Sequence, residues 1–316
     1  MQKPNRRTFL QTTAGTLAFG LNAIPAATQA SAAAGDEAAA FPPSQTAPVV
    51  ASNQGKKPLR LGLIIAIGKD PGAAIAKVRD LGLPSCQVFA SDFDLKDAAP
   101  LRQALDENKI EATSFVVGGP GREVWDFYDG PLTIGLVPRE TRAARIAHLK
   151  NPALQTHCGF IPENPSDPFY KETVTAMREV AEYCKRNGQN FRYETGQETP
   201  ITLVRAIRDV GLENQGVNFD LANLILYGKA NPVDAIETLA PYVQGIHAKD
   251  GLFPTNPRQL GEEVPIGKGK VDFPLIIARL KQLQYGGAVT IEREISGPKQ
   301  IADVRAAKEY LGALIG

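Results

Sequence analysis

The sequence predicts an α/β fold, a single-domain (β/α)8 or TIM barrel over residues 58–316. Short apolar runs alternate with helical patterns eight times, and the 259 residues of this region match the roughly 250 residues of a typical barrel. The competing fold, a doubly wound open sheet, normally carries a glycine-rich phosphate-binding turn after its first strand. Residues 68–72 read Gly-Lys-Asp-Pro-Gly at that place and lack the GxGxxG spacing, which favours the barrel.

Each predicted strand is a short, mainly apolar run that ends at a turn or at the start of a helix. The first run ends at the turn of residues 68–72, and the third ends at the Gly-Gly-Pro-Gly of residues 118–121. In chain order, the eight runs cover residues 59–65, 85–89, 110–117, 153–159, 191–195, 216–221, 243–248 and 288–291. Their alternation with helical segments predicts a parallel sheet.

The predicted helices carry apolar residues at helical spacing and begin or end at recognised signals. Thr199-Pro200 and Asn231-Pro232 are start signals, because a polar cap precedes a proline in the first turn. Gly82, Gly188 and Gly211 are stop signals. In chain order, we expect helices at residues 75–81, 101–105, 141–149, 170–184, 199–210, from 231 onward, at 272–286 and at 301–311.

Four residues of metal-ligand type fall at the ends of the fifth to eighth predicted strands, namely Glu194, Asp220, His247 and Glu292. In a barrel the strand ends meet at one face, where the chemistry gathers. Three carboxylates and one imidazole suit a single divalent cation such as Mn²⁺, Mg²⁺, Co²⁺ or Zn²⁺. Taken alone, each of the three acids could equally be a loop residue, and the histidine could be a buried core residue. Their occurrence on four consecutive strands predicts a metal site.

Several segments resemble the xylose isomerase-like barrel superfamily, in its sugar phosphate isomerase/epimerase branch. These segments are residues 193–198, 218–223, 247–250, 264–269 and 290–294. The resemblance implies that the same four residues are the metal ligands, and that Glu194 and Glu292 are also the catalytic acid and base on opposite faces of the sugar. Glu194 is preferred over Glu198, which we expect in the first turn of a helix, where an acid is simply stabilised by the helix dipole.

Two positions depart from the pattern of that branch. Asn223 stands where well-studied ketose epimerases have a histidine, and Gln87 stands where many relatives have an acid. These departures leave the substrate open.

Weaker candidates could bind the substrate. His157 is either a substrate contact or a core histidine, and Lys249 either binds a substrate oxygen or pairs with Asp250. Trp125 either stacks on a sugar ring or covers the barrel end. The full set of predicted substrate-binding residues is His157, Lys249, Asn223, Arg293, Glu294 and Trp125.

These residues favour a metal-dependent sugar isomerase or epimerase that moves a proton beside a ketose carbonyl. A lyase or hydrolase that acts on keto-glycosides could use the same site, and a noncatalytic sugar-binding barrel is a further alternative. An abasic-site endonuclease shares the barrel but uses a zinc cluster with several histidines. The chain has only three, at residues 148, 157 and 247. The cysteines, Cys86, Cys158 and Cys184, form no CxxC pair, so we expect buried thiols rather than a zinc ribbon.

Residues 1–34 are expected to be an export signal peptide. Arg6-Arg7 precede an uncharged, weakly apolar stretch that ends in an alanine-rich run, and the pair resembles a twin-arginine signal. Thr, Gln, Gly and Asn interrupt this stretch, which argues against a membrane anchor. Residues 35–57 are rich in Ala, Pro and Ser and predict a flexible linker.

Removal of this signal changes the charge balance of the chain. Without its three basic residues, 32 basic and 34 acidic residues remain, a net charge of −2. Such a charge argues against nucleic acid as a partner. We therefore expect a periplasmic protein with a small sugar or glycoside as its partner and no stable membrane insertion after cleavage. Homo-oligomerisation is left open.

Overall fold

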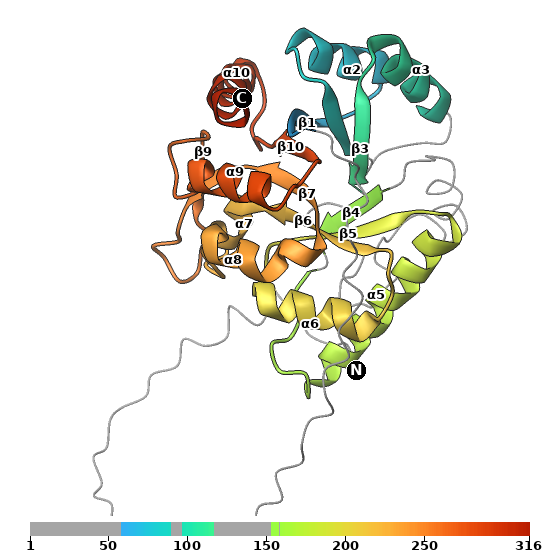
Figure 1. Ribbon diagram of the computed structural model, residues 1–316, viewed down its shortest axis with the longest axis vertical. Coiled ribbons are helices and arrows are strands. Elements are labelled where there is room, and N and C mark those ends of the chain that lie inside the picture. The colour runs from blue at the N-terminus through green and yellow to red at the C-terminus, as the bar shows by residue number, and fades with distance from the viewer. Residues whose placement is uncertain (1–57, 90–96, 117–152, 158) are drawn as a thin grey trace, which may run out of the picture. The chain divides into compact units, whose positions relative to one another are not determined.

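The computed structural model describes residues 58–89, 97–116, 153–157 and 159–316 (Figure 1). Eight parallel strands close a barrel in the order β1-β10-β7-β6-β5-β4-β3-β2. They are β1 (Arg60–Ala66), β2 (Ser85–Phe89), β3 (Glu111–Val116), β4 (Ala153–His157), β5 (Asn190–Glu194), β6 (Gln215–Asp220), β7 (Val243–Ala248) and β10 (Ala288–Ile291). Each lies where an apolar run predicts a strand, so the single-domain (β/α)8 barrel is confirmed.

The helices alternate with the barrel strands along the chain. They are α2 (Pro71–Asp80), α3 (Ala98–Asn108), α5 (Pro168–Arg186), α6 (Pro200–Val210), α7 (Leu221–Leu226), α8 (Pro232–Leu239), α9 (Phe273–Gln282) and α10 (Pro298–Ile315), with a 3-10 turn, η2 (Ala240–Tyr242). The predicted helix at 141–149 lies outside the described residues. Two elements have no counterpart in the sequence prediction: α7, and a small antiparallel sheet of β8 (Asp250–Leu252) and β9 (Glu262–Val264).

Caps and prolines set most of the helix starts. Asp70, Asp167, Asn231 and Asp272 each accept a hydrogen bond from a backbone N–H in the first turn, and a proline follows within two residues. The predicted cap Thr199 is also the N-cap residue, but its side chain makes no capping bond. Its hydroxyl oxygen instead lies 2.8 Å from the hydroxyl oxygen of Thr202.

Alternation along the strands separates an apolar shell from a polar barrel interior. On β5, Phe191 and Tyr193 belong to the hydrophobic core, whereas Arg192 and Glu194, which also are buried, alternate with them. Gln87 on β2 donates a hydrogen bond to Asn218 on β6. Because β2 and β6 are opposite each other in the closed barrel, this bond must cross its interior.

Two of the three cysteines lie in the described residues. Cys86 and Cys184 are buried free thiols, as predicted, and burial raises the pKa of each to about 12. Cys158 lies outside the described residues.

Candidate metal centre

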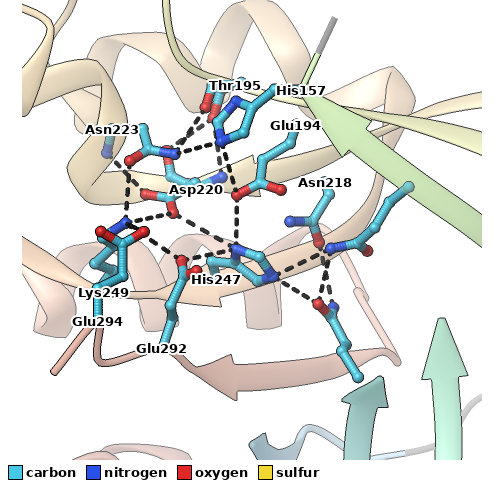
Figure 2. Close-up of polar contacts among 12 residues, drawn as sticks. His157, Glu194, Thr195, Asn218, Asp220, Asn223, His247, Lys249, Glu292 and Glu294 are labelled. Atoms are coloured by element: carbon cyan, nitrogen blue, oxygen red, sulfur yellow. Dashed lines mark hydrogen bonds and ion pairs between the residues drawn. The ribbon is translucent and has the colours of Figure 1, made fainter. Parts of the chain in front are cut away.

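Four side chains meet at the carboxyl end of the barrel (Figure 2). Glu194 and Asp220 are the last residues of β5 and β6, His247 is the second-last residue of β7, and Glu292 directly follows β10. One ligand atom from each residue lies within 4.8 Å of the other three. The structure therefore brings together the four residues that the sequence predicts as metal ligands.

The Nδ1 atom of His247 lies at the centre of this group. It is 3.0 Å from Oε1 of Glu194, 3.1 Å from Oε2 of Glu292 and 3.5 Å from Oδ2 of Asp220. The side chain of Glu292 is 11% exposed, and the other three are more deeply buried. Three carboxylates so close together need a strong positive charge between them.

Local hydrogen bonds fix how Asp220 presents its two oxygens. Its Oδ1 accepts a hydrogen bond from the backbone N–H of Asn223 at 2.7 Å and so caps α7. The Thr195 hydroxyl donates to the carbonyl oxygen of Asp220 at 2.8 Å and accepts from its N–H at 2.9 Å. The cap leaves Oδ2 of Asp220 directed toward His247.

The donor set fits a divalent cation. Within the described ranges, Oδ2 of Asp220 and Oε2 of Glu292 are buried and have no hydrogen-bond partner. Such buried acceptors are costly unless something positive lies against them. Ligand oxygens around one Mg²⁺ or Mn²⁺ ion lie up to about 4 Å apart, close to the spread of this group. Glu194, Asp220, His247 and Glu292 could therefore hold one ion without rearrangement of the strands.

Burial and nearby charges push the pKa values of two carboxyl groups in opposite directions. Burial raises the pKa of Asp220 to about 7, although the ammonium group of Lys249 opposes the rise. Burial would also raise the pKa of Glu292, but the positive charges of Lys249 and His247 outweigh it and hold this pKa well below its usual value. The site thus contains carboxyl groups of unequal acidity.

The third carboxylate and the two cations stabilise each other. Burial would raise the pKa of Glu194, but His157 and His247 hold it below its usual value. Burial would lower the pKa values of His247 and Lys249, yet the carboxylates raise both well above normal, with Glu194 and Glu292 acting on the imidazole. Without a metal ion, these two cations provide the balancing charge.

Lys249 is a buried cation beside the four candidate ligands. Its Nζ donates to Oε1 of Glu294 at 2.7 Å and to Oδ1 of Asn223 at 3.3 Å, and it lies 3.5 Å from Oε2 of Glu292. The alternative partner, Asp250, is engaged elsewhere, because its carboxylate accepts hydrogen bonds from backbone N–H groups of the following loop. The structure therefore groups three predicted substrate contacts, Lys249, Asn223 and Glu294.

His157 lies at the open edge of the same group. Its side chain is 34% exposed, and its Nε2 is 3.5 Å from Oε1 of Glu194 and 3.5 Å from Nδ2 of Asn223. Figure 2 shows the ring close to both Glu194 and Asn223. This placement differs from that of a core histidine and leaves the ring accessible to a small molecule.

Arg293, another predicted substrate contact, is engaged away from this group. Arg293 forms ion pairs with Glu263 and Asp303, both at 2.9 Å. Its guanidinium group therefore ties the segment after β10 to β9 and α10. Trp125 lies outside the described residues, and its role stays a prediction.

The sequence prediction for Glu198 is wrong about its position. Helix α6 begins at Pro200 with Thr199 as its N-cap, so Glu198 precedes the helix rather than lying in its first turn. It is 2% exposed, and burial raises its pKa to about 7. Its Oε1 accepts a hydrogen bond from the backbone N–H of Gly196 at 3.3 Å. The proline two residues later was the signal that could have placed it before the helix.

Residues 75–314 match the family model described as xylose isomerase-like TIM barrel. This match covers more than half of the chain, so the chain belongs to the xylose isomerase-like TIM barrel family. It is 28% identical over 177 residues to the uncharacterized protein MJ1311 of Methanocaldococcus jannaschii, which is 52% of this chain and 56% of that protein. The chain thus spans about half the length of this curated relative.

Solved structures agree with the family assignment. A xylose isomerase domain protein from Planctomyces limnophilus is 32% identical, with a TM-score of 0.69 over 81% of this chain and 97% of that chain. A D-psicose 3-epimerase, solved in the presence of D-fructose, is 20% identical, with a TM-score of 0.59 over 81% of this chain and 99% of that chain. The second likeness shows a shared fold.

Proposed function

We propose that this chain is a divalent-metal-dependent sugar isomerase or epimerase that moves a proton beside a ketose carbonyl. The observation that carries the proposal is the convergence of Glu194, Asp220, His247 and Glu292 at the carboxyl end of the barrel. Barrel enzymes perform their chemistry at this end. The fold that the chain shares with a sugar epimerase supports the same reading.

In this proposal the four residues hold one Mn²⁺, Mg²⁺, Co²⁺ or Zn²⁺ ion. A bound divalent cation would supply Lewis-acid stabilisation of the enediolate that forms when the proton leaves carbon. Glu194 and Glu292 carry the proton: one carboxylate removes it from the carbon, and the other returns a proton on the opposite face. The lowered pKa values of both keep them ionised and able to accept it.

Lys249, Asn223 and His157 are assigned to the substrate oxygens. Lys249 is buried, but its partner Glu294 is 60% exposed, so a substrate oxygen can replace that carboxylate without burying a new charge. His157 presents its accessible ring next to Glu194. Glu294 contacts the substrate at the rim in this proposal, whereas Arg293 acts indirectly, because its ion pairs hold the rim in place.

Solvent exchange tests this function. Ketoses incubated with the metal-loaded protein in deuterated water should gain deuterium at the carbon beside the carbonyl. Glu194→Gln and Glu292→Gln should each abolish this exchange, because the amide cannot accept the proton. If the wild-type protein binds metal but exchanges no proton of any ketose or keto-glycoside, the enzymatic proposal is wrong and a noncatalytic sugar-binding barrel replaces it.

The same experiment separates the second candidate, a lyase or hydrolase acting on keto-glycosides. Removal of the proton beside a ketone can be followed by loss of a glycosidic leaving group instead of return of the proton. Keto-glycosides that release their aglycone, with no epimer formed, would assign this reaction to the same four residues.

We further propose that residues 1–34 are a twin-arginine export signal and residues 35–57 a linker, which places residues 58–316 in the periplasm as the functional domain. All residues before 58 lie outside the described part of the chain. Within that described part, no helix combines the length and apolar character needed to cross a membrane. N-terminal sequencing of protein from the periplasm tests the proposal, and a retained residue 1 in cytosolic protein would contradict it.

A further inference from the structure

The second ring nitrogen of His247 faces the barrel interior, away from the carboxylates. Its Nε2 lies 2.5 Å from Oε1 of Gln87, a side chain that comes from β2. Both side chains are at most 1% exposed. An amide oxygen can only accept, so the short contact requires a hydrogen on Nε2. Nδ1, on the other side of the ring, faces Glu194 and Glu292.

Neighbouring groups fix the direction of the Gln87 amide. Its Oε1 also accepts from Nε2 of Gln155 at 2.8 Å, and its Nε2 donates to Oδ1 of Asn218 at 3.3 Å. Ser114 in turn donates to Oε1 of Gln155 at 2.7 Å, which turns the Gln155 amide nitrogen toward Gln87. The amide nitrogen of Gln155 also lies 3.2 Å from Nε2 of His247, so these two nitrogens are both donors to the nearer Oε1 of Gln87.

Register shifts between neighbouring strands position these amide side chains. The register between β2 and β3 shifts so that Gln87 lies beside Ser114, and a similar shift between β6 and β7 sets Asn218 beside Gly245. A Cβ atom at Gly245 would lie 2.4 Å from Oδ1 of Asn218, so only glycine leaves room for this acceptor. The interior is built to hold the Gln87 amide in one orientation.

We propose that Gln87 is a positioning residue that holds the hydrogen of His247 on Nε2 and so keeps the lone pair of Nδ1 available for the metal ion. The inference rests on the proposed metal-dependent function. The reversed amide would direct its NH₂ group at Nε2 and favour the tautomer with hydrogen on Nδ1, which cannot bind a cation through that atom. Strands β2, β3 and β4 carry none of the four candidate ligands. Through Gln87, Ser114 and Gln155 they nevertheless determine which ring nitrogen of His247 carries the hydrogen.

Metal titration of three variants tests the inference. Calorimetry with Zn²⁺ should give one site per wild-type chain, and Gln87→Leu should weaken binding roughly 10–100-fold, because outer partners of ligand histidines contribute that much. Gln87→Glu should restore the affinity, since a carboxylate accepts the same hydrogen. Gln244→Leu removes another buried amide of the barrel, which donates to the Gln215 carbonyl, and should bind like wild type.

Nitrogen NMR of the zinc-loaded protein gives a readout independent of affinity. Only three histidines are present, so ¹⁵N-histidine spectra are simple to assign. We expect one ring with hydrogen on Nε2 in the wild type and loss of that single state in Gln87→Leu. If the wild type binds Zn²⁺ and a folded Gln87→Leu protein binds equally well with an unchanged spectrum, the inference is wrong and the proposed function stands. If the wild type binds no metal ion, the proposed function fails first and takes the inference with it.

Discussion

The ammonium nitrogen of Lys249 lies 3.5 Å from Oε2 of Glu292, deep in the carboxyl end of the barrel. The lysine is 2% exposed, and its other contacts are with Glu294, Asn223 and Asp220. A lysine in such a position is stable only because carboxylates surround it, and the carboxylates in turn depend on its charge. This pairing links the stability of the barrel to the charge of the site.

Lys249→Met should therefore destabilise the metal-free protein. Removal of one partner of a buried ion pair typically costs about 3–5 kcal/mol, because the opposite charge is left buried. Urea unfolding of chelator-treated protein measures the loss. Exposed Lys268→Met is the matched control and should change the free energy of unfolding by less than about 0.5 kcal/mol. Equal stability of the two variants would contradict the coupling.

A bound metal ion should stabilise the folded protein. A ligand that binds only the folded state stabilises it by about 2.7 kcal/mol at a concentration of 100 times its Kd. Mn²⁺ should therefore raise the melting temperature of the wild type, and Asp220→Asn should remove most of the rise, because an amide is a poorer ligand. A rise of equal size in Asp220→Asn would mean that Mn²⁺ binds elsewhere.

Asp250 should anchor the loop that follows β7. Its Oδ1 accepts from the N–H groups of Gly251 and Val271, and its Oδ2 accepts from those of Gly267 and Gly269, at 2.8–3.1 Å. Asp250→Asn turns an NH₂ group toward two of these donors and should cost about 3 kcal/mol. Chemical denaturation measures the cost, and limited proteolysis should show faster cleavage between residues 253 and 270. Unchanged cleavage would argue that other contacts hold the loop.

Glu198 should make stability fall as pH rises. Its folded pKa is raised by burial from 4.5 to about 7, so the folded state holds a proton that the unfolded state loses earlier. The stabilising contribution of the protonated carboxyl group is fully present below pH 4.5. The free energy of unfolding then falls by about 3 kcal/mol as the pH rises from 4.5 through 7. Glu198→Gln should therefore gain stability over wild type at pH 8 and show no gain at pH 4. Unfolding curves at both pH values measure this difference, and an equal effect at both would exclude the buried carboxyl as its source.

Sequence alone predicts the barrel and the four strand-end residues, since both follow from local patterns. Apolar runs of the right length define the strands, and the parallel barrel then forces Glu194, Asp220, His247 and Glu292 to one end. Local patterns also predict the helix cap at Asn231 and the helix start at Asp272, because capping depends on neighbouring residues.

Other features depend on contacts that are distant in the chain. The pairing of Lys249 with Glu294 rather than Asp250 is set by a loop that returns to Asp250 from residues 267–271. The contact of Gln87 with His247 joins residues 160 positions apart across the barrel interior. Nothing in the residues next to Gln87 indicates that its amide meets an imidazole. Such contacts appear only when the strands are assembled.

Anomalous diffraction from crystals of the Mn²⁺-loaded protein, measured at the manganese edge, tests the proposed metal site most directly. We expect one anomalous peak per chain, bounded by Glu194, Asp220, Glu292 and the Nδ1 atom of His247. A peak bound through other residues, or none at a Mn²⁺ concentration that raises the melting temperature, would contradict it.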